Sequence, residues 1–425
     1  MSQDTEGSNP SPSAPLKNGY LNKDSTMANS NLTNAKKAKN DEFYTQYHDI
    51  EKEIAAYIEY NPDALKGKTV FLPCDDPEWS NFTKFFAQSF VRFGLKKLIS
   101  TSYAAKSKHN VNDYQPTLFE TNNPQYDKNK TAQNGKIFTL TRDKTGDGKV
   151  DVNDLEWHYL EGDGDFRSDE IKKLRDESDI IITNPPFSLF RPFLDWVIEA
   201  SKQFVIIGSK NAITYKEVFP LIKTNKMWVG TTSFNKDMLF ISPEEIDPTQ
   251  KPSTATRTVD GIVYLRSPSV WFTNLDHGRR HQLLPLMTMA DNLKYSKHKE
   301  IKGKESYEKY DNYDAIDVPF TDAIPSDYKD VMGVPISFLD KYSPEQFEII
   351  GMSKTPIGTH LRTKVYPKQV QVDKSGKKSN VTKLNDGTAI VVSSPPSDKV
   401  YYVVGDKLYV ATYPRVLIKH RKGTA

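Results

Sequence analysis

Four short strand-like runs that lack polar alternation constrain the fold of this chain more than any other feature. They read GKTVFLP at residues 67–73, LKKLISTSY at 95–103, DIIITN at 179–184 and QFVIIGS at 203–209. A strand with one solvated face alternates, whereas a strand buried on both faces does not. Helical patterns lie between these runs, and this interleaving is typical of a parallel sheet covered by helices on both faces. We therefore predict a doubly wound α/β domain over about residues 39–230.

The composition and the hydrophobic pattern of the chain change on either side of this domain. Residues 1–38 are rich in Ser, Asn, Pro and Lys, and we expect them to form a flexible tail. After Trp228, short strands are separated by Pro- and Gly-containing turns, and strongly alternating runs near the end predict β-hairpins. We place a second, mixed α+β domain at about residues 231–425. The Lys- and Tyr-rich stretch at residues 294–314 is expected to be an exposed loop.

Composition limits the class of protein. The formal net charge is only +3, so a nucleic-acid partner would have to meet a local basic face. The single Cys74 excludes an internal disulfide, and one Cys with eight His makes a zinc site unexpected. No run approaches the roughly 18 apolar residues of a membrane span, and the N-terminus does not resemble a signal peptide. We expect a cytoplasmic protein with no membrane partner.

The turn Asn184-Pro185-Pro186-Phe187 directly follows the DIIIT run. In a doubly wound sheet, ligands bind at the carboxyl ends of the strands, which is where this turn is expected. The prolines fix the backbone and leave carbonyl oxygens free to accept, and the Asn side-chain carbonyl is a further acceptor. Phe187 offers a flat apolar face against which a planar ring can stack. The alternative is a Pro-Pro turn that merely ends a strand.

Two rigid acceptors suit a target with two amino hydrogens, such as the exocyclic amine of a nucleobase or an amide. The nitrogen of such a group is a poor nucleophile because its lone pair is delocalised into the π system. Acceptors that hold both N–H bonds favour the pyramidal geometry that develops in the transition state. The turn therefore predicts methyl transfer to an amino nitrogen, for which S-adenosylmethionine is the required donor.

The cofactor loop would follow the first strand, in the segment VFLPCDDPEWSNF. This segment has no glycine, although methyltransferases with this fold usually have a Gly-rich turn there. Asp75 and Asp76 offer carboxylates for the methionine ammonium, while Ser80 and Asn81 suit the cap of the next helix. The Pro-Cys pair at Cys74 is similar to the nucleophile of cytosine C5 methyltransferases, but the accompanying Glu motif is absent, so we expect a structural Cys.

The chain also carries a series of longer motifs. They read DEFYTQY, CDDPEWSNF, FGLKKLI, GDGDFRS, DIIITNPPFSLFR, ITYKEVFPLIK, WFTNLD, YDNYDAI, VMGVPISFL and PEQFEII. In this order they resemble the EcoRI-type adenine-specific DNA methyltransferases, from about Lys36 to Lys354 and again in the closing YPRVLIKHRK. Cofactor motifs come before the recognition region, which is the gamma arrangement. Residues 1–35 and about 355–410 look like additions to the family core, and the sequence leaves open whether they bind DNA, bind a partner or only decorate the fold.

The resemblance implies methyl transfer from S-adenosylmethionine to the N6 amine of an adenine that is flipped out of duplex DNA. It implies a Rossmann-like catalytic domain and a C-terminal target-recognition domain. It also implies restriction-modification, with a companion endonuclease that acts on the same site without a stable complex. Two alternatives stay open: an RNA or protein-glutamine N-methyltransferase with the same mechanism, and a non-catalytic DNA-binding protein of the same fold.

The resemblance assigns roles to particular residues. In the catalytic turn, Asn184 and Pro185 would hold the amine, Pro186 would stiffen the backbone and Phe187 would stack on the base. DEFYTQ would lie near the methionine part of the cofactor, and the acid of GDGDF would accept from the cofactor's adenine amine. No acid ends the second strand, so no residue is assigned to the ribose hydroxyls. The expected cofactor-binding residues are Phe43, Tyr44, Thr45, Asp75, Asp76, Pro77, Asn81, Asp165 and Phe166.

Residues 143–154 match a twelve-residue calcium loop of the EF-hand type. Position six is Gly148, but position twelve is an Asp where a longer, bidentate Glu is usual, and no entering helix is evident. The alternative is an acidic turn before the GDGDF motif. The candidate ligands are Asp143, Thr145, Asp147, Asp151 and Asp154.

Candidate DNA contacts lie after the QFVIIGS run and in the second domain. GSKNAITYK offers Lys210, Asn211 and Lys216, and NLDHGRRH offers Arg279 and Arg280. Arg suits guanine edges and Asn suits adenine, although most basic residues at such places contact phosphate. For each of these residues, ordinary exposed surface is the alternative.

Overall fold

A central sheet of eight strands organises the part of the chain that the structure describes. The structure is a computed structural model, and it describes residues 44–75, 80–104, 121, 124–241 and 256–421. Four neighbouring strands are parallel: β3 (Lys97–Ser102), β2 (Thr69–Leu72), β6 (Ile180–Thr183) and β7 (Gln203–Ser209). These are the four runs without alternation, and β2 and β6 are buried along their whole length.

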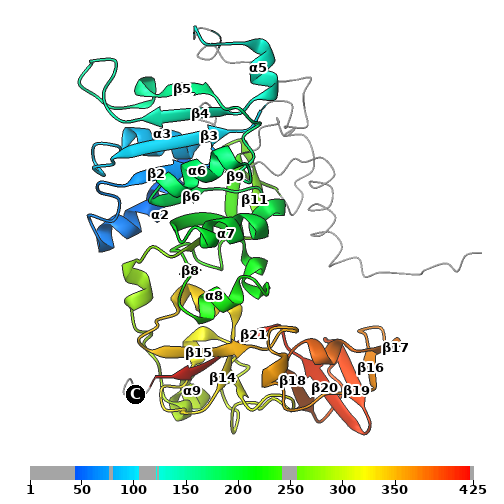
Figure 1. The fold of residues 1–425 in the computed structure, drawn as a ribbon. Coiled ribbons are helices and arrows are strands. Elements are labelled where there is room, and N and C mark those ends of the chain that lie inside the picture. The colour runs from blue at the N-terminus through cyan, green and yellow to red at the C-terminus, as the bar shows by residue number, and fades with distance from the viewer. Residues whose placement is uncertain (1–43, 76–79, 105–120, 122–123, 242–255, 422–425) are drawn as a thin grey trace, which may run out of the picture. The chain divides into compact units, whose positions relative to one another are not determined.

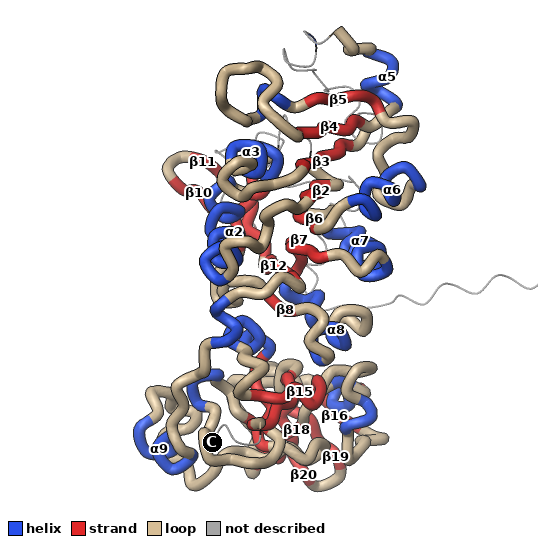
Figure 2. The backbone as a smooth tube through the Cα atoms, turned by 60° about the vertical axis from the view of Figure 1, so that its left-hand side comes forward, coloured by secondary structure: helices blue, strands red, loops and turns tan. Residues whose placement is uncertain are grey.

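Antiparallel strands extend the sheet on both sides. They are β4 (Lys136–Leu140), β5 (Glu156–Tyr159), β8 (Trp228–Val229) and β12 (Ser269–Thr273). The order is β5-β4-β3-β2-β6-β7-β12-β8, which can be followed down the view in Figure 2. Because β12 pairs with β7, the sheet continues past residue 230, the boundary predicted from the sequence.

Helices cover both faces of this sheet. On one face lie α2 (Tyr47–Tyr60) and α3 (Asn81–Gln88); on the other lie α6 (Asp169–Glu177) and α7 (Phe190–Glu199) (Figure 2). Successive strand residues point to opposite faces, so Val70 packs in the cluster under α2 and α3 whereas Phe71 packs in the cluster under α6 and α7. The predicted mixed α/β class is confirmed.

Short helices complete this region. An α8 helix (Phe219–Lys223) follows β7, and α5 (Lys128–Gln133) precedes β4. Four 3-10 segments are η2 (Val152–Asp154), η3 (Phe187–Leu189), η4 (Lys210–Thr214) and η5 (Gly278–His281). No helix among the described residues is long and apolar enough to cross a membrane.

A small second sheet contains the only described strand of the N-terminal motif. In the order of the sheet its strands are β1 (Tyr44–Thr45), β9 (Met238–Ile241), β11 (Ile262–Ser267) and β10 (Thr256–Val259). Thr45 is opposite Phe240 in the antiparallel β1–β9 pair. The first described residues of the chain are thereby joined to a segment almost two hundred positions later.

Two further sheets form the C-terminal part (Figure 1). The first has the order β13-β14-β21-β15, and the second has the order β17-β16-β19-β20-β18. Helix α9 (Met289–Tyr295) precedes these strands, and the 3-10 segments η6 (Thr321–Ala323), η7 (Ile336–Lys341), η8 (Thr359–Leu361) and η9 (Lys383–Asp386) lie between them in the chain. The strands are β13 (Ile316–Asp317), β14 (Met332–Pro335), β15 (Phe347–Met352), β16 (Gln369–Val372), β17 (Lys378–Val381), β18 (Ala389–Val392), β19 (Tyr401–Val404), β20 (Lys407–Ala411) and β21 (Arg415–His420).

The second of these sheets, which we call the hairpin sheet (residues 369–411), contains the β-hairpins predicted near the C-terminus. It has a small apolar cluster of its own, made by Tyr366, Leu384, Ala389, Tyr402 and Tyr409. Each of the hairpins β16–β17 and β19–β20 is antiparallel. The chain then returns to the neighbouring sheet through β21, which pairs with both β14 and β15.

The expectation of an exposed loop at residues 294–314 is correct for its lysines, which are exposed, and wrong for its buried tyrosines. The segment is largely irregular, but Tyr307, Tyr310 and Tyr313 are buried and Asn312 has no exposed surface. The Tyr310 hydroxyl donates to Asp317 at 2.5 Å, and the Asn312 amide donates to the carbonyl of Gly387 at 2.9 Å. The many lysines hid this role, because a tyrosine buries its ring once its hydroxyl finds a partner.

Candidate active site

The candidate active site lies where the strand order of the central sheet reverses. From β2 the chain continues to β3 on one side, and it later returns to β6 on the other side of β2. In open α/β sheets, ligands bind in the crevice outside the carboxyl ends of the strands at such a point. Asp75 follows β2 and Asn184 follows β6, so the structure brings the predicted cofactor loop and the predicted catalytic turn to the same place.

A buried carboxylate connects these two loops. Thr183, the last residue of β6, donates its hydroxyl to Oδ2 of Asp75 at 2.5 Å, and Ser80 donates to Oδ1 at 2.7 Å. Asp75 is 4% exposed and Thr183 has no exposed surface. The Asp75 carbonyl accepts from the hydroxyls of Thr83 (3.1 Å) and Ser100. Both carboxylate oxygens of Asp75 therefore hold the protein's own hydroxyls, and the residue fixes the start of the catalytic turn.

The catalytic turn is short and stiff. Asn184 is half-buried, Pro185 is buried, and Pro186 leads into η3, which continues directly into α7. The ring of Phe187 lies edge-on to Phe240, with centroids 5.9 Å apart and planes at 81°. Since Phe240 pairs with Thr45 in the second sheet, the turn is close to the N-terminal motif as well as to the loop after β2.

The N-terminal motif is connected to the same helix start. Asn81 donates its amide to the Thr45 carbonyl at 2.8 Å, and Ser80 caps α3 by accepting from the backbone N–H of Phe82. Ser80 therefore caps α3 as predicted. Asn81, the other residue predicted to cap α3, uses its side chain to hydrogen-bond β1. The Thr45 hydroxyl is buried and has no hydrogen-bond partner among the described residues. A buried hydroxyl without a partner is costly, so this atom suits a polar group of a bound ligand.

The GDGDF motif lies at the carboxyl end of β3. A side chain at Gly164, which has a φ of +89°, would collide with the carbonyl of Ser102, so the backbones approach closely here. Asp165 accepts from the backbone N–H and Nε of Arg167, both at 2.8 Å. The Arg167 hydrogen bonds, outweighing partial burial, lower the pKa of Asp165. The Asp165 carboxylate is therefore ionised and placed at the ligand edge of the sheet.

Phe166 has a different environment from its neighbour. It has no exposed surface, and its ring makes edge contacts with Phe193 and Trp196 of α7 at 5.2 and 5.6 Å between centroids. The structure thus gives Phe166 a packing role under the GDGDF loop. Three of the predicted cofactor residues, Phe43, Asp76 and Pro77, lie outside the described residues.

Sequence reasoning did not find Tyr103. It follows β3 directly and lies near Cys74 and Asp165, with burial as the main cause that raises its pKa well above the usual value. Its position is the end of the second parallel strand, where an acidic residue was sought in the sequence. A search for any hydrogen-bonding side chain at that position, rather than for an acid alone, would have found it.

These residues fit S-adenosylmethionine as the bound donor. The Thr45 hydroxyl without a partner, the close backbone approach at Gly164 and the ionised Asp165 carboxylate lie at the carboxyl edge of β2, β3 and the strands beside them. They provide polar partners for the amino-acid part and for an adenine amine, together with room for a ligand at the backbone. The loop after β2 has no Gly-rich turn, and the glycine that allows a close backbone approach, Gly164, lies in the loop after β5 instead.

The predicted DNA contacts divide into two groups. Asn211 and Lys216 are exposed, as a contact with DNA requires. Lys210 is engaged: its ammonium donates to the carbonyls of Phe234 (2.6 Å) and Lys236 (2.8 Å) and to the carboxylate of Asp237 (2.9 Å). All three of its donors are used inside the protein, so Lys210 ties the end of β7 to the segment before β9.

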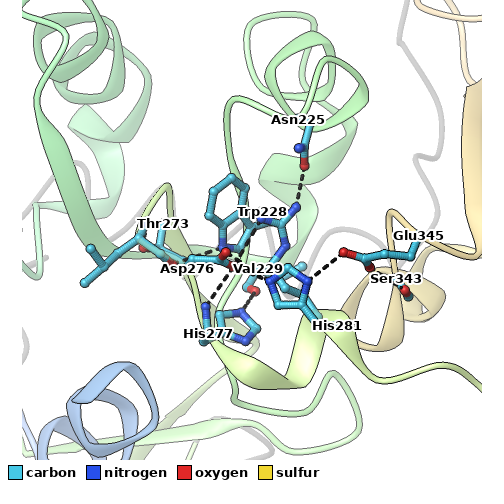
Figure 3. Close-up of polar contacts among 11 residues, drawn as sticks. Asn225, Trp228, Val229, Thr273, Asp276, His277, His281, Ser343 and Glu345 are labelled. Carbon is cyan, nitrogen blue, oxygen red and sulfur yellow. Dashed lines mark hydrogen bonds and ion pairs between the residues drawn. The ribbon is translucent and has the colours of Figure 1, made fainter. Parts of the chain in front are cut away.

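Arg279 and Arg280 are also held by the protein. Arg279 donates to the Thr231 carbonyl and lies 3.5 Å from the buried carboxylate of Asp340. Arg280 is 7% exposed, and its guanidinium lies 3.6 Å from the centre of the Trp228 ring. Beside them, His281 bridges Asp276 and Glu345 (Figure 3). This group connects the central sheet with the C-terminal part.

The calcium prediction is not supported. No group of three or more potential ligand side chains that could hold a metal ion occurs among the described residues. Instead, the carboxylates accept backbone N–H groups of their own loop: Asp143 from Gly146 and Gly148, and Asp154 from Lys144, Thr145 and Asp151. The N–H groups of Thr145, Asp151 and Lys144 lower the pKa of Asp154 to about 2. The alternative, an acidic turn, describes this loop.

Comparison with known proteins identifies similar sequences over most of the chain. Residues 31–421 match the family model described as "Adenine-specific methyltransferase EcoRI". The chain is 43% identical over 325 residues to the Type II methyltransferase M.EcoRI of Escherichia coli, covering 76% of this chain and 89% of that protein. It is 35% identical over 335 residues to the Type II methyltransferase M.MpnI of Mycoplasma pneumoniae, covering 78% and 89%. No solved structure gives a significant match.

Proposed function

Because the chain belongs to the EcoRI family of adenine-specific methyltransferases, we propose that it methylates the N6 amine of an adenine in duplex DNA, with S-adenosylmethionine as donor. The observation that carries this proposal is the buried hydrogen bond between Thr183 and Asp75. It holds the proline-rich turn beside the loop after β2, at the point of the sheet where ligands bind. The target base has to leave the stack to reach this turn.

The turn acts on the amine through its oxygen atoms. The Asn184 side-chain carbonyl and the Pro185 carbonyl accept the two N–H groups, which draws the nitrogen toward a pyramidal geometry and frees its lone pair. Phe187 stacks on the flipped base and orients it. The donor supplies an electrophilic methyl group on a sulfonium. With the donor bound, its S–C bond would break as the new N–C bond forms, and Asn184 and Pro185 would hold the two N–H groups until one proton passes to water.

The cofactor-binding residues of the proposal come from β1 and from the loops that follow β3 and β5. Tyr44 and Thr45 are placed near the methionine part, and Asp165 is placed to accept from the adenine amine of the cofactor. Tyr103 joins them because it directly follows β3, the strand next to β2, where the ribose of a nucleotide cofactor is expected. Asp75 acts by positioning the turn and the α3 start through Thr183 and Ser80.

The domain organisation follows from the sheets. We assign the eight-stranded sheet and its helices to a Rossmann-like catalytic domain that extends to Thr273, and the residues after it to a DNA target-recognition domain. In this assignment Asn211 and Lys216 face the DNA. Arg279 and Arg280 hold the two parts together, whereas Lys210 links two segments of the catalytic domain. The similarity to proteins named Type II methyltransferases supports a role in the cytoplasm, paired with an endonuclease of the same specificity.

Methyl-transfer assays with three substrate classes test the proposal. We expect tritium from the labelled donor to appear in duplex DNA and not in RNA or protein. Sequencing of methylated adenines in DNA from cells that express the chain identifies the site. Label in RNA or in glutamine side chains would instead favour an RNA or protein-glutamine N-methyltransferase with the same mechanism. Binding of DNA without any methylation by the wild-type protein would instead favour a non-catalytic DNA-binding protein.

A further inference from the structure

Positive charge is concentrated in and around the hairpin sheet. Residues 362–412 contain nine Lys and Arg against four Asp, a formal charge of +5. The whole chain has a formal charge of +3, so all its other residues together carry −2. The motifs that carry the family resemblance end at about Lys354 and resume at Tyr413, on either side of this segment. The segment therefore carries a charge opposite in sign to that of the rest of the chain, which suits a polyanionic partner.

Exposed lysines lie at both ends of the hairpin sheet, and four of them lie together at one end. Strand β16 ends at Val372, which pairs with Tyr401, so the β16–β17 turn lies next to the start of β19. We call this the lysine end. It carries four exposed lysines, none of which forms an ion pair with a described residue: Lys374, Lys377, Lys378 and Lys399.

Two acidic residues at the lysine end do not neutralise these lysines. Asp373 is used by its own turn, where Oδ1 accepts from the backbone N–H of Ser375 (2.9 Å) and of Lys377 (3.0 Å). Asp398 precedes Lys399 in the chain and is exposed. With four lysines against two aspartates, the lysine end keeps an excess of two positive charges. By contrast, Lys364 of the same segment is paired with Asp311 at 2.6 Å.

A cavity lies between the C-terminal part and the carboxyl end of β7, and Tyr413 is among the residues that line it. Strand β20 ends at Ala411, beside the start of β18 and at the lysine end of the sheet. Tyr413, two residues later, is 86% exposed and lines a cavity with Lys354 and with Asn211 of η4. Lys354 donates to the Thr214 hydroxyl at 2.8 Å. Because η4 follows β7, this cavity begins at the carboxyl edge of the central sheet, the edge on which Asn184 lies.

We propose that the lysine end binds phosphates of duplex DNA outside the methylated site. The inference rests on the proposed function, because it takes the substrate to be duplex DNA that extends beyond the active site. Lysine ammonium groups act as point charges toward phosphate and carry no base readout. The surface therefore adds affinity that depends on DNA length and on salt, and it leaves the recognised sequence unchanged.

The test compares two triple variants with the same change of charge. The first, Lys374→Gln, Lys377→Gln and Lys378→Gln, removes three charges from the lysine end. The control removes three exposed lysines, Lys66, Lys96 and Lys226, in the same way; they precede β2, β3 and β8, at the opposite edge of the central sheet. Both are measured for binding to a duplex of about 40 base pairs and to one of about 12, each containing the mapped site, over a range of salt. Circular dichroism and melting curves check folding.

We expect the first variant to bind the long duplex at least tenfold more weakly, with the slope of log K against log salt reduced by about 2 to 3. Its binding and methylation of the short duplex should equal those of the wild type, and the control variant should bind both as the wild type does. Equal loss in the control, no loss in the first variant, or a loss that appears only with RNA or with an acidic protein would overturn the proposal. Binding needs no methyl transfer, so a protein that methylates no DNA would refute the proposed function in the labelling assay. The same comparison of long and short duplexes would then be made with duplexes of arbitrary sequence, because phosphate contacts carry no base readout.

Discussion

The hydroxyl of Thr183 donates to the carboxylate of Asp75 at 2.5 Å, and this contact connects the loops that follow β2 and β6. Both residues are buried, so water does not replace the bond if it is removed. The residue after Thr183 is Asn184, whose oxygen has to meet a substrate amine. A change at Thr183 or Asp75 is therefore expected to act on the reaction through the position of the turn.

Replacing Thr183 by Val should lower kcat on the order of tenfold to a hundredfold, because the turn loses its anchor while its chemistry is intact. It should also destabilise the protein by about 1 to 3 kcal/mol, since a buried carboxylate oxygen loses its donor. Thr183→Ser keeps the hydroxyl and is the matched control, with kcat near that of the wild type. Steady-state kinetics with duplex DNA would contradict this account if Val and Ser at this position gave equal kcat.

Thr45 tests the proposed cofactor site without disturbing the free protein. Its hydroxyl is buried without a partner, so Thr45→Val should leave the melting temperature of the ligand-free protein unchanged or slightly higher. The same change should weaken binding of S-adenosylmethionine about fivefold to tenfold, through loss of one hydrogen bond. Isothermal titration calorimetry gives the affinity, and Thr45→Ser serves as the control. Unchanged affinity in the Val variant would mean that this hydroxyl does not contact the donor.

His281 predicts a pH dependence of the contact between the central sheet and the C-terminal part. Burial lowers its pKa, but hydrogen bonds to Glu345 (2.7 Å) and Asp276 (2.9 Å) outweigh this and raise the pKa overall. A histidine whose pKa is higher in the folded than in the unfolded protein stabilises the fold. This stabilisation is complete when the pH is below the unfolded-state pKa, and it is lost as the pH rises through the folded-state pKa.

We therefore expect His281→Gln to lower the melting temperature at pH 6 and to have less effect at pH 9. The pair contribution should be about 1 kcal/mol or less, since both carboxylates are partly exposed. His360→Gln, at an exposed His outside this group, is the control. An effect of equal size at both pH values would show that the ring stabilises by packing on Tyr60 and not by its charge.

The acidic turn at residues 143–154 should be indifferent to calcium. Neither calcium nor a chelator is expected to shift the melting temperature, because the carboxylates already accept backbone N–H groups. Asp154→Asn should destabilise the protein at pH 7 more than Asp147→Asn does. Asp154 accepts from three backbone N–H groups, whereas Asp147 accepts from one. The lowered pKa of Asp154, about 2, means that its contribution is present above the unfolded value near 4 and is lost as pH falls toward 2. A calcium-dependent rise in melting temperature would contradict this interpretation.

The parallel strands were readable from the sequence because each is a short run without polar alternation, and no other buried arrangement suits such runs between helices. The place of Asn184 followed from this, since a residue after a parallel strand lies at the ligand edge. The extension of the sheet by β12 could not be predicted, because nothing in the sequence of β12 indicates that it pairs with β7 and β8. Tyr103 was missed because its role depends on which loops meet at the end of β3.

Charged residues were the least predictable. Lys210, Arg279 and Arg280 look like DNA contacts in the sequence, yet their partners are carbonyls and carboxylates tens of residues away. Nothing local distinguishes a cation that binds phosphate from one that joins two segments of the protein. The same holds for the acidic turn, where the spacing of a calcium loop is also the spacing at which carboxylates accept their own backbone N–H groups.

The central claim is that Asn184 holds the target amine while methyl transfer takes place. The most direct test is the single-turnover rate of methyl transfer to duplex DNA by Asn184→Ala, measured with the affinities for donor and DNA in the same preparation. The account predicts a rate at least a hundredfold lower, with both affinities close to those of the wild type. A rate within a few-fold of the wild type at unchanged affinities would show that the amine is held elsewhere.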